Sequence, residues 1–284
     1  MKKFKNLVIV TLIMSLVVSV MVGCAPAETS ELKVVTSTSL IAQITERVGG
    51  ETVDVVNIIP PSQCPGHFDV KPGDIQKLAE ADLFLLHGWQ GEKFSQELID
   101  SANNPDLVAV KVDVKVEGNT NWMTPPVQQA AVDRIVDALS QLDAENSAAY
   151  QERAADYKAA VEDKEGEIAL RIAEGDFPGI NVMCNEQLLG FVQWTGLNIV
   201  AVYGRPDSLT PQVVKELVDT GREENVTLII DNLQSGKDGG VGIAEELGCK
   251  RVIFTNFPGG FDGNETWEKA IDYDIGLILE AIAD

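Results

Sequence analysis

Short apolar runs alternate with amphipathic segments along most of the chain, and this alternation constrains the fold more than any other feature of the sequence. The apolar runs are rich in Val, Ile and Leu, and the segments between them have the apolar spacing of helices. Strands that alternate with helices predict a parallel sheet with right-handed crossovers. Strands are expected at residues 32–35, 53–59, 83–86, 107–110, 180–183, 198–202, 227–230 and 251–254.

The predicted helices divide the strands into two groups of four. Each group would form its own parallel sheet, so the fold class is α/β with two lobes, each a sheet flanked by helices. Helices are expected at residues 40–48, 72–80, 92–102, 187–195, 211–221 and 241–247, with a closing helix at 266–282.

The segment between the two groups has a different character. Residues 127–173 contain no Pro and one Gly, and a break is plausible only near residues 142–146. A helix over residues 146–173 would be ~40 Å long, enough to join both lobes. The alternative is two separate surface helices of one larger domain. We therefore expect a signal peptide at 1–23, lobes at 24–125 and 176–284, and a connecting helical segment at 126–175.

The first 24 residues have the layout of a secretory signal. Three lysines within the first five residues precede an apolar run over 7–22, and Gly23 and Cys24 close it. A charged start, a short apolar stretch and a small residue before the cut are typical of a cleaved signal peptide. The end of the segment resembles a bacterial lipobox, which implies cleavage before Cys24 and a lipid on its thiol. The alternative, a transmembrane anchor, usually needs ~20 apolar residues.

The chain is strongly acidic, with a formal net charge of −22. Loss of residues 1–23 removes three lysines and no acidic residue, so the mature chain would carry −25. Such a surface repels nucleic acid and anionic lipid headgroups. We therefore expect no nucleic-acid partner, and attachment through the lipid alone to the outer face of the cytoplasmic membrane, at the cell surface or on the periplasmic side.

The loop after the second predicted strand is the first candidate site. Residues 57–74 lead from this strand into a helix and carry Cys64 and His67 in a Pro- and Gly-rich turn. The carboxyl ends of strands are where open α/β sheets collect ligand-binding side chains. Cys64 precedes His67 by three residues, a separation at which one loop can hold one ion with two side chains.

The segment PPxxxxGHFDVKPGDIQKLAEADLFLLHG, together with the lipobox, the two α/β lobes and the long helix, resembles the metal-binding solute receptors of bacterial ABC importers. In this zinc and manganese group, one rigid helix joins the lobes. The resemblance also covers VTLIIDNLQSGK and VIFTNFPGG, and so essentially the mature chain. It implies a substrate-binding protein that captures a transition metal ion in the cleft and delivers it to a membrane permease. It also implies that His67 supplies the first metal ligand.

The other three ligand positions of that group carry different residues here. The second, just before a Trp-x-x-Pro element, falls at the Thr-Asn pair 120–121. The third, after the first strand of the second lobe, falls at residues 184–186, which read Cys-Asn-Glu. The fourth, an Asp after the last strand, is matched by Asn256. The usual set of three nitrogens and a carboxylate is therefore absent.

Other side chains at predicted strand ends are candidate substitutes. His87 and Asp231 each end a strand, and Cys184 and Glu186 follow one. Thiolate, imidazole and carboxylate together suit Zn²⁺, with Mn²⁺, Fe or Cu as alternatives. The predicted metal ligands are His67, His87, Cys64, Cys184, Glu186 and Asp231, with Asn256, Trp122 and Trp89 as secondary cleft residues.

Several alternatives remain open for these residues. His87 could bond to the backbone of its turn, Asp231 could cap the next turn, and Cys64 and Cys184 could form a disulfide. The tryptophans could pack the lobe interface, or could line a pocket for an organic ligand. The cargo could accordingly be a metal chelate, a corrinoid or another small organic molecule, and a surface adhesin is a further alternative.

The sequence favours a binding protein over an enzyme. It contains no HExxH and no GxSxG motif, and the glycine-rich run at residues 236–240 lacks the Walker spacing. We expect a non-enzymatic, monomeric protein that works with an ABC permease.

Overall fold

The computed structural model describes residues 31–89 and 92–283. Within the chain, Leu32–Asp284 form one compact unit. The predicted signal peptide and the lipidation site Cys24 lie outside the described residues. Among the helices of the described ranges, none is both long enough and apolar enough to span a membrane.

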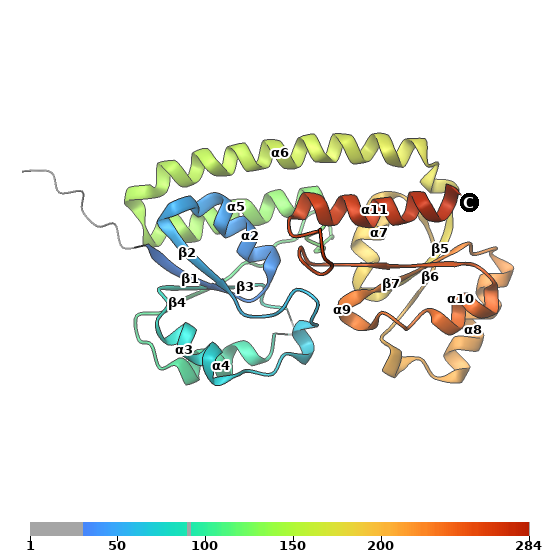
Figure 1. Cartoon of the computed structure of the whole chain (residues 1–284), viewed down its shortest axis with the longest axis horizontal. Helices are drawn as coiled ribbons and strands as arrows, with labels where there is room; N and C mark the ends of the chain where they lie inside the picture. Colours follow the sequence, from blue (N-terminus) through green and yellow to red (C-terminus); the bar gives the residue numbers. More distant parts are fainter. Residues whose placement is uncertain (1–30, 90–91, 284) are drawn as a thin grey trace, which may run out of the picture. The chain divides into compact units, whose positions relative to one another are not determined.

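The alternation of strands and helices produces two parallel four-stranded sheets, as the sequence predicts (Figure 1). Their strand orders are β2-β1-β3-β4 and β6-β5-β7-β8. In each sheet the second strand is added on one side of the first strand and the later strands on the other side, so the order of strands reverses there. Ligands of open α/β sheets bind at this reversal, outside the carboxyl ends of the strands. The strands are β1 (Leu32–Thr36), β2 (Val53–Asn57), β3 (Leu83–Leu86), β4 (Val108–Lys111), β5 (Asn181–Asn185), β6 (Asn198–Tyr203), β7 (Leu228–Asn232) and β8 (Lys250–Phe254).

Proline residues and short polar side chains set several helix starts. Pro72 occupies the first turn of α3, and Asp74 accepts a hydrogen bond from the backbone N–H of Lys71 at 3.1 Å. Thr210 caps α8 by accepting from Val213 N at 3.3 Å. The helices are α2 (Ser39–Gly49), α3 (Pro72–Ala79), α4 (Phe94–Ala102), α5 (Pro125–Leu142), α6 (Ser147–Glu174), α7 (Leu189–Thr195), α8 (Pro211–Glu223), α9 (Leu233–Gly236), α10 (Val241–Leu247) and α11 (Trp267–Ala283).

The long helix α6 spans 28 residues and is therefore about 42 Å long. It packs against α2 and α5 of the first sheet's layer and against α11 of the second (Figure 1). Arg153 donates to the Gly49 carbonyl at 2.7 Å, and Arg171 pairs with Asp272 at 2.9 Å. The prediction of one long connecting helix after a break at residues 142–146 is confirmed.

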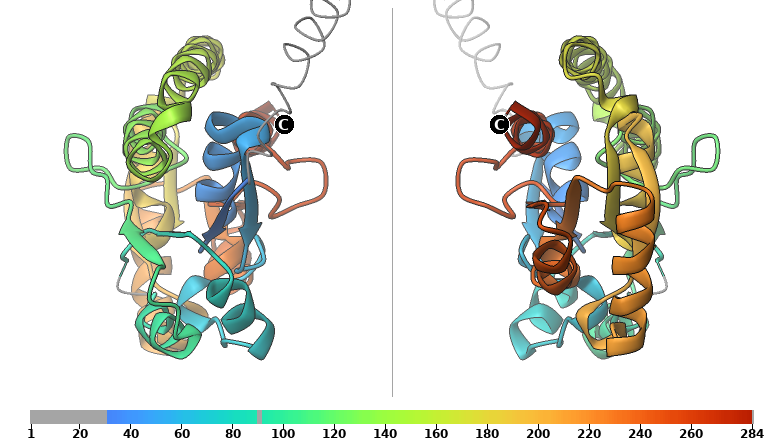
Figure 2. Two further views of the ribbon diagram at one scale, coloured as in Figure 1. Left: turned by 90° about the vertical axis from the view of Figure 1, so that its left-hand side faces the viewer. Right: turned by 90° about the vertical axis from the view of Figure 1, so that its right-hand side faces the viewer.

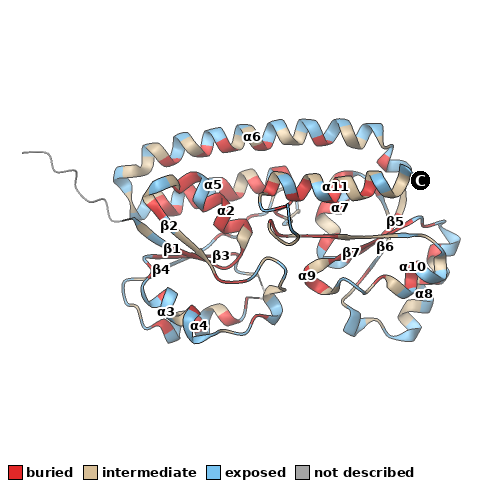
Figure 3. Ribbon diagram, viewed as in Figure 1, coloured by how far each residue is buried: buried red, intermediate tan, exposed pale blue. Residues whose placement is uncertain are grey.

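The two sheets also share one apolar core. A single cluster of buried side chains includes Leu85 of the first sheet and Ile230 and Phe254 of the second. Helix α11 begins next to α2, where Trp267 N donates to the Gln43 side chain at 2.7 Å. The views along the long axis place the two helices on the same side of the molecule (Figure 2). Figure 3 shows the buried stripe of α5 and the exposed outer surface of α6. This continuous packing restricts motion of one sheet against the other.

The strands β5 and β7 each extend two residues beyond their predicted ends. Both finish on an asparagine, and that side chain accepts a backbone N–H of the following turn. Asn185 accepts from Gln187 N at 3.0 Å, and Asn232 accepts from Ser235 N at 2.7 Å. Because the polar asparagine belongs to both the strand and the cap, the apolar pattern ends before the strand does. The four-residue helix α9 was not predicted, since it is too short for periodicity.

Candidate functional site

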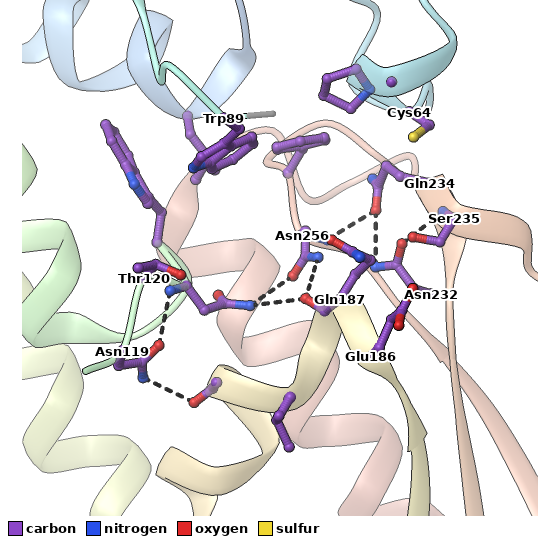
Figure 4. Close-up of a pocket in the computed structure, with 18 of the residues that line it drawn as sticks. Cys64, Trp89, Asn119, Thr120, Glu186, Gln187, Asn232, Gln234, Ser235 and Asn256 are labelled. Atoms are coloured by element: carbon purple, nitrogen blue, oxygen red, sulfur yellow. Dashed lines mark hydrogen bonds between the residues drawn. The ribbon is translucent and has the colours of Figure 1, made fainter. Parts of the chain in front are cut away.

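A cavity of about 800 Å³ lies at the carboxyl ends of strands from both sheets (Figure 4). The loop after β2 contributes Cys64, and the loop after β3 contributes Trp89. Arg205 follows β6, and Asn256 follows β8. This volume lies within the range of sites for small molecules, about 300–1,000 Å³. The topology therefore places the cavity where the sequence predicts a ligand site.

Neutral amide side chains form the centre of the wall (Figure 4). Asn121 donates to the side-chain oxygen of Asn256 at 3.1 Å, and Asn256 donates to the Gln187 carbonyl at 3.0 Å. Asn119 donates to the Gly190 carbonyl at 3.0 Å. These bonds join segments that are 69 to 135 residues apart in the chain. The amides hold the two sides of the cavity together without any charged group.

Gln234 supports this group of amide side chains through hydrogen bonds. Its side-chain nitrogen donates to the Pro61 carbonyl at 2.8 Å and to the Thr255 hydroxyl at 2.9 Å. Its oxygen accepts the backbone N–H of Asn256 at 3.1 Å. Gln234 is nearly buried, so these bonds fix the direction in which Asn256 faces the cavity.

Aromatic rings form a second part of the wall. The Trp89 and Phe257 rings lie 6.4 Å apart between centroids and are nearly parallel. The Trp89 ring stacks on the His87 ring at 3.6 Å between centroids, and the Trp122 ring meets His87 in an edge-on arrangement at 4.3 Å. The stack restrains Trp89, which presents a flat apolar surface to the cavity.

Arg205 lies against the loop that carries Cys64 and His67. One guanidinium nitrogen is 2.5 Å from Nδ1 and 2.8 Å from Nε2 of His67, and another is 3.8 Å from the Cys64 sulfur. His67 is exposed at the end of a 3₁₀ turn, Pro65–His67. A permanent cation therefore occupies the place beside the thiol and imidazole where a metal ion was predicted.

The six predicted metal ligands do not converge. Cys64 and Glu186 line the cavity, and His67 contacts Arg205 at its edge. His87, Cys184 and Asp231 do not line it. Within the ranges that the structure describes, no group of three or more His, Cys, Asp or Glu side chains is placed to hold a metal ion. The secondary residues Asn256, Trp89 and Trp122 all line the cavity.

The prediction of Cys184 at the site is wrong because this residue lies inside β5 rather than in the loop after it. Its side chain is fully buried in the apolar core, and burial raises the pKa of its thiol to about 12. A neutral thiol in such surroundings packs as a small hydrophobe. The alternative of a Cys64–Cys184 disulfide is also wrong, since both cysteines are free.

The prediction of Asp231 as a ligand is wrong for a related reason. Asp231 lies within β7 and is fully buried. Its carboxylate accepts from Arg251 at 2.6 Å, from the Tyr203 hydroxyl at 2.8 Å and from Gly240 N at 2.7 Å. These three partners take most of the roughly four acceptor sites of the carboxylate, which is buried away from the cavity and stabilises the second sheet instead of binding cargo.

His87 is fully buried behind the aromatic wall, so its predicted role as a metal ligand is also wrong. Its Nε2 lies 2.7 Å from the Thr38 hydroxyl. Glu92 accepts the backbone N–H of His87 at 3.2 Å and the Ser37 hydroxyl at 2.5 Å. This buried network fixes the turn that carries Trp89.

The burial of His87 predicts a loss of stability in acid. Desolvation holds the pKa of His87 well below its usual 6.5, so only the unfolded chain takes up this proton as the pH falls below 6.5. His87→Gln keeps a polar group for Thr38 but does not titrate. Below pH 6.5, the free energy of unfolding of the parent should fall relative to this variant by about 1.4 kcal/mol per pH unit. Urea unfolding at several pH values measures this, and parallel profiles would contradict it.

Sequence reasoning missed Arg205, Gln187 and Gln234. Arginine and neutral amides are not usual metal ligands, so a pattern of metal-binding side chains at the strand ends predicts Asn256 as a secondary residue but not these three. Arg205 lies two residues beyond the end of β6, so the rule that selected Glu186 would also have selected Arg205.

Comparison with known proteins identifies relatives over nearly the whole chain. Residues 34–281 match the family described as ZnuA, zinc-uptake complex component A, periplasmic. The metal ABC transporter substrate-binding lipoprotein SsaB of Streptococcus sanguinis is 29% identical over 45% of this chain and 47% of its own length. The manganese ABC transporter substrate-binding lipoprotein PsaA of Streptococcus anginosus is 24% identical over 84% of this chain and 80% of its own. The chain thus spans about half the length of SsaB.

Solved structures share the fold at low sequence identity. A zinc-bound deletion mutant of ZnuA has a TM-score of 0.76 and 20% identity, and the match covers 89% of this chain and 98% of that one. A manganese-bound periplasmic metal-binding protein from Candidatus Liberibacter asiaticus has a TM-score of 0.75 and 18% identity, with 89% and 100% covered. These matches establish the two-lobe α/β architecture.

Proposed function

We propose that this chain, which belongs to the ZnuA family of periplasmic zinc-uptake components, is the substrate-binding protein of an ABC importer for a transition metal. The observation that supports this proposal is the cavity at the carboxyl ends of both sheets, whose walls come from segments far apart in the chain. Such a cavity is suited to binding and release of a ligand. Zinc is the proposed metal, with manganese, iron or copper as alternatives.

Capture would require only small movements of the cavity wall. The shared core and α6 connect the two sheets, so wide hinge closure is not expected, and loop rearrangement remains. The hydrogen bonds between amide side chains across the cavity contribute only about 0.5–1.5 kcal/mol each to stability. The permease can therefore open the cavity again. Cys64, His67 and Glu186 are the proposed contacts to the metal of the cargo, because they lie in or beside the cavity. Metal binding by Cys64 and His67 would require the Arg205 side chain to move away from them.

The proposed location is the outer face of the cytoplasmic membrane, through a lipid on Cys24. Names of the relatives SsaB and PsaA include the word lipoprotein, which supports this part of the proposal. The protein would work there as a monomer beside a membrane permease, without catalysis.

The proposal is tested by metal accumulation in cells. A strain that lacks this protein should contain less zinc when grown in metal-limited medium, as measured by mass spectrometry of whole cells. The parent chain should restore the zinc content, and Cys24→Ala, which cannot be lipidated, should restore it less well. An unchanged content of zinc, manganese, iron and copper in the deletion strain would refute the proposed function.

A further inference from the structure

The cavity is large for a bare ion. A zinc ion bound by protein has its ligands at about 2.0–2.3 Å, which requires a small and closed set of donors. The cavity here measures about 800 Å³, and the donors in its wall come from at least six separate strand ends and loops of the described residues. The space fits an organic molecule of moderate size.

Six amide side chains in the wall suit an organic ligand better than a metal. Asn119, Asn121, Gln187, Asn232, Gln234 and Asn256 all line the cavity, and every one is a neutral amide. Zinc in proteins is held by thiolate, imidazole and carboxylate, and a neutral amide lacks the charge of these ligands. Amides present both donors and acceptors, which match the hydroxyl, carbonyl and carboxylate groups of an organic molecule.

Arg205 gives the cavity a positive group that a free cation would avoid. Its Nε is buried without a hydrogen-bond partner among the described residues. The carboxylate that it approaches, Asp207, is 3.8 Å away and 78% exposed, so this pair is weak. A guanidinium binds a carboxylate through two parallel hydrogen bonds. At Arg205 these would come from the free Nε and from Nη2, whose contact with His67 the carboxylate would replace.

The aromatic wall completes a site for a carbon framework. Trp89 and Phe257 offer nearly parallel faces to the cavity, and the stack on His87 restrains Trp89. Leu40 adds a further apolar contact. A hydrated ion gains nothing from such surfaces, whereas an organic ligand buries its apolar atoms against them.

We infer that the cargo enters this cavity as a metal complex of a small carboxylate-bearing chelator, whose carboxylate binds Arg205 and whose carbon framework lies against Trp89 and Phe257. This inference rests on the proposed function and narrows its substrate class. Cys64 and Glu186 remain available at the wall for the metal of the complex.

The test compares free metal with its complexes on the purified mature chain, stripped of metal. Thermal shift and tryptophan fluorescence are recorded with zinc chloride, with citrate and pyridine-2,6-dicarboxylate alone, and with the zinc complexes of both chelators. At least one complex should raise the melting temperature more than zinc chloride or its free chelator does, because ligands that bind only the native state stabilise it. The same complex should change the tryptophan fluorescence, because Trp89 and Trp122 both line the cavity.

Arg205→Met should weaken binding of that complex by about 10- to 100-fold, which is about 1.4–2.8 kcal/mol at 1.4 kcal/mol per factor of ten. Arg222→Met is the matched control, since Arg222 lies on the surface beside Glu246 at 3.2 Å and should leave affinity unchanged. If Arg205→Met does not fold, Arg205→Lys keeps the charge but loses the fork and should weaken binding less.

Three results would overturn the inference. Zinc chloride could bind as tightly as the tighter of the two complexes, neither complex could shift the melting temperature, or Arg205→Met could leave the affinity for the complex unchanged. If a free chelator bound as tightly as its zinc complex, the claim that the cargo contains a metal would be contradicted. The proposed function fails separately, through unchanged metal content in the deletion strain.

Discussion

Replacing Arg251 with methionine is expected to lower the free energy of unfolding by about 3–5 kcal/mol, because the fully buried Asp231 would lose its cation. In the native chain, Arg251 lies 2.6 Å from this carboxylate and also donates to the Lys237 carbonyl at 2.7 Å. Tyr203 and Gly240 would remain as hydrogen-bond donors, but neither carries a charge. The large loss follows from leaving a buried charge uncompensated.

Urea unfolding of the purified mature chain measures this loss. Arg222→Met is the control, since its ion pairs with Asp219 and Glu246 are exposed and should contribute at most about 1 kcal/mol. Combining Arg251→Met with Asp231→Asn should recover part of the stability, because the uncompensated charge is gone. If Arg251→Met left stability intact and abolished cargo binding, Asp231 would belong to the binding site after all.

Asp274→Asn is expected to remove a loss of stability with rising pH. Asp274 is fully buried on α11, where one oxygen accepts from Thr255 N at 3.1 Å and the other has no partner among the described residues. Burial raises the pKa of Asp274 well above the usual 3.8, so the native state keeps a proton that the unfolded chain releases. Above pH 3.8, the parent should therefore lose about 1.4 kcal/mol per pH unit until the native carboxyl itself titrates.

The measurement is a series of urea unfolding curves from pH 4 to pH 8 on the parent and the variant. The two free energies should lie closest together near pH 4 and diverge as the pH rises, with the variant more stable. This trend is opposite in sign to that of His87, so the two variants separate the two groups. A gap between parent and Asp274→Asn that did not change with pH would show that Asp274 is not held protonated.

Much of the fold follows from the sequence because its signals are local and repeated. The apolar runs predict all eight strands, and the Pro-free stretch after residue 142 predicts α6. The predicted ends of these elements differ from the observed ends by only a few residues, so each element is still recognised. The interlocked core of the two sheets, with Trp267 on α11 bonded to Gln43, depends on contacts 224 residues apart and has no local signal.

The site depended on details that such patterns do not resolve. A residue just after a strand can face the cavity, whereas a residue inside the strand faces one side of the sheet or the other. An error of one or two residues in the predicted end of a strand therefore decides whether a side chain is placed in the cavity or in the core. Cys184 and Asp231 were expected beyond their strands and lie inside them. The amide pair Asn121 and Asn256 forms across 135 residues, and its role becomes visible only when the fold brings the two together.

We expect the cavity to bind its metal within an organic complex, and the roles assigned to Arg205 and Trp89 depend on this. Native mass spectrometry of the full-length protein, purified gently from membranes of cells that import the metal, tests this most directly. We expect a bound mass equal to one metal ion plus an organic acid, lost in Arg205→Met and kept in Arg222→Met. A bound mass equal to a single metal ion, kept in both variants and lost in His67→Ala, would contradict the account.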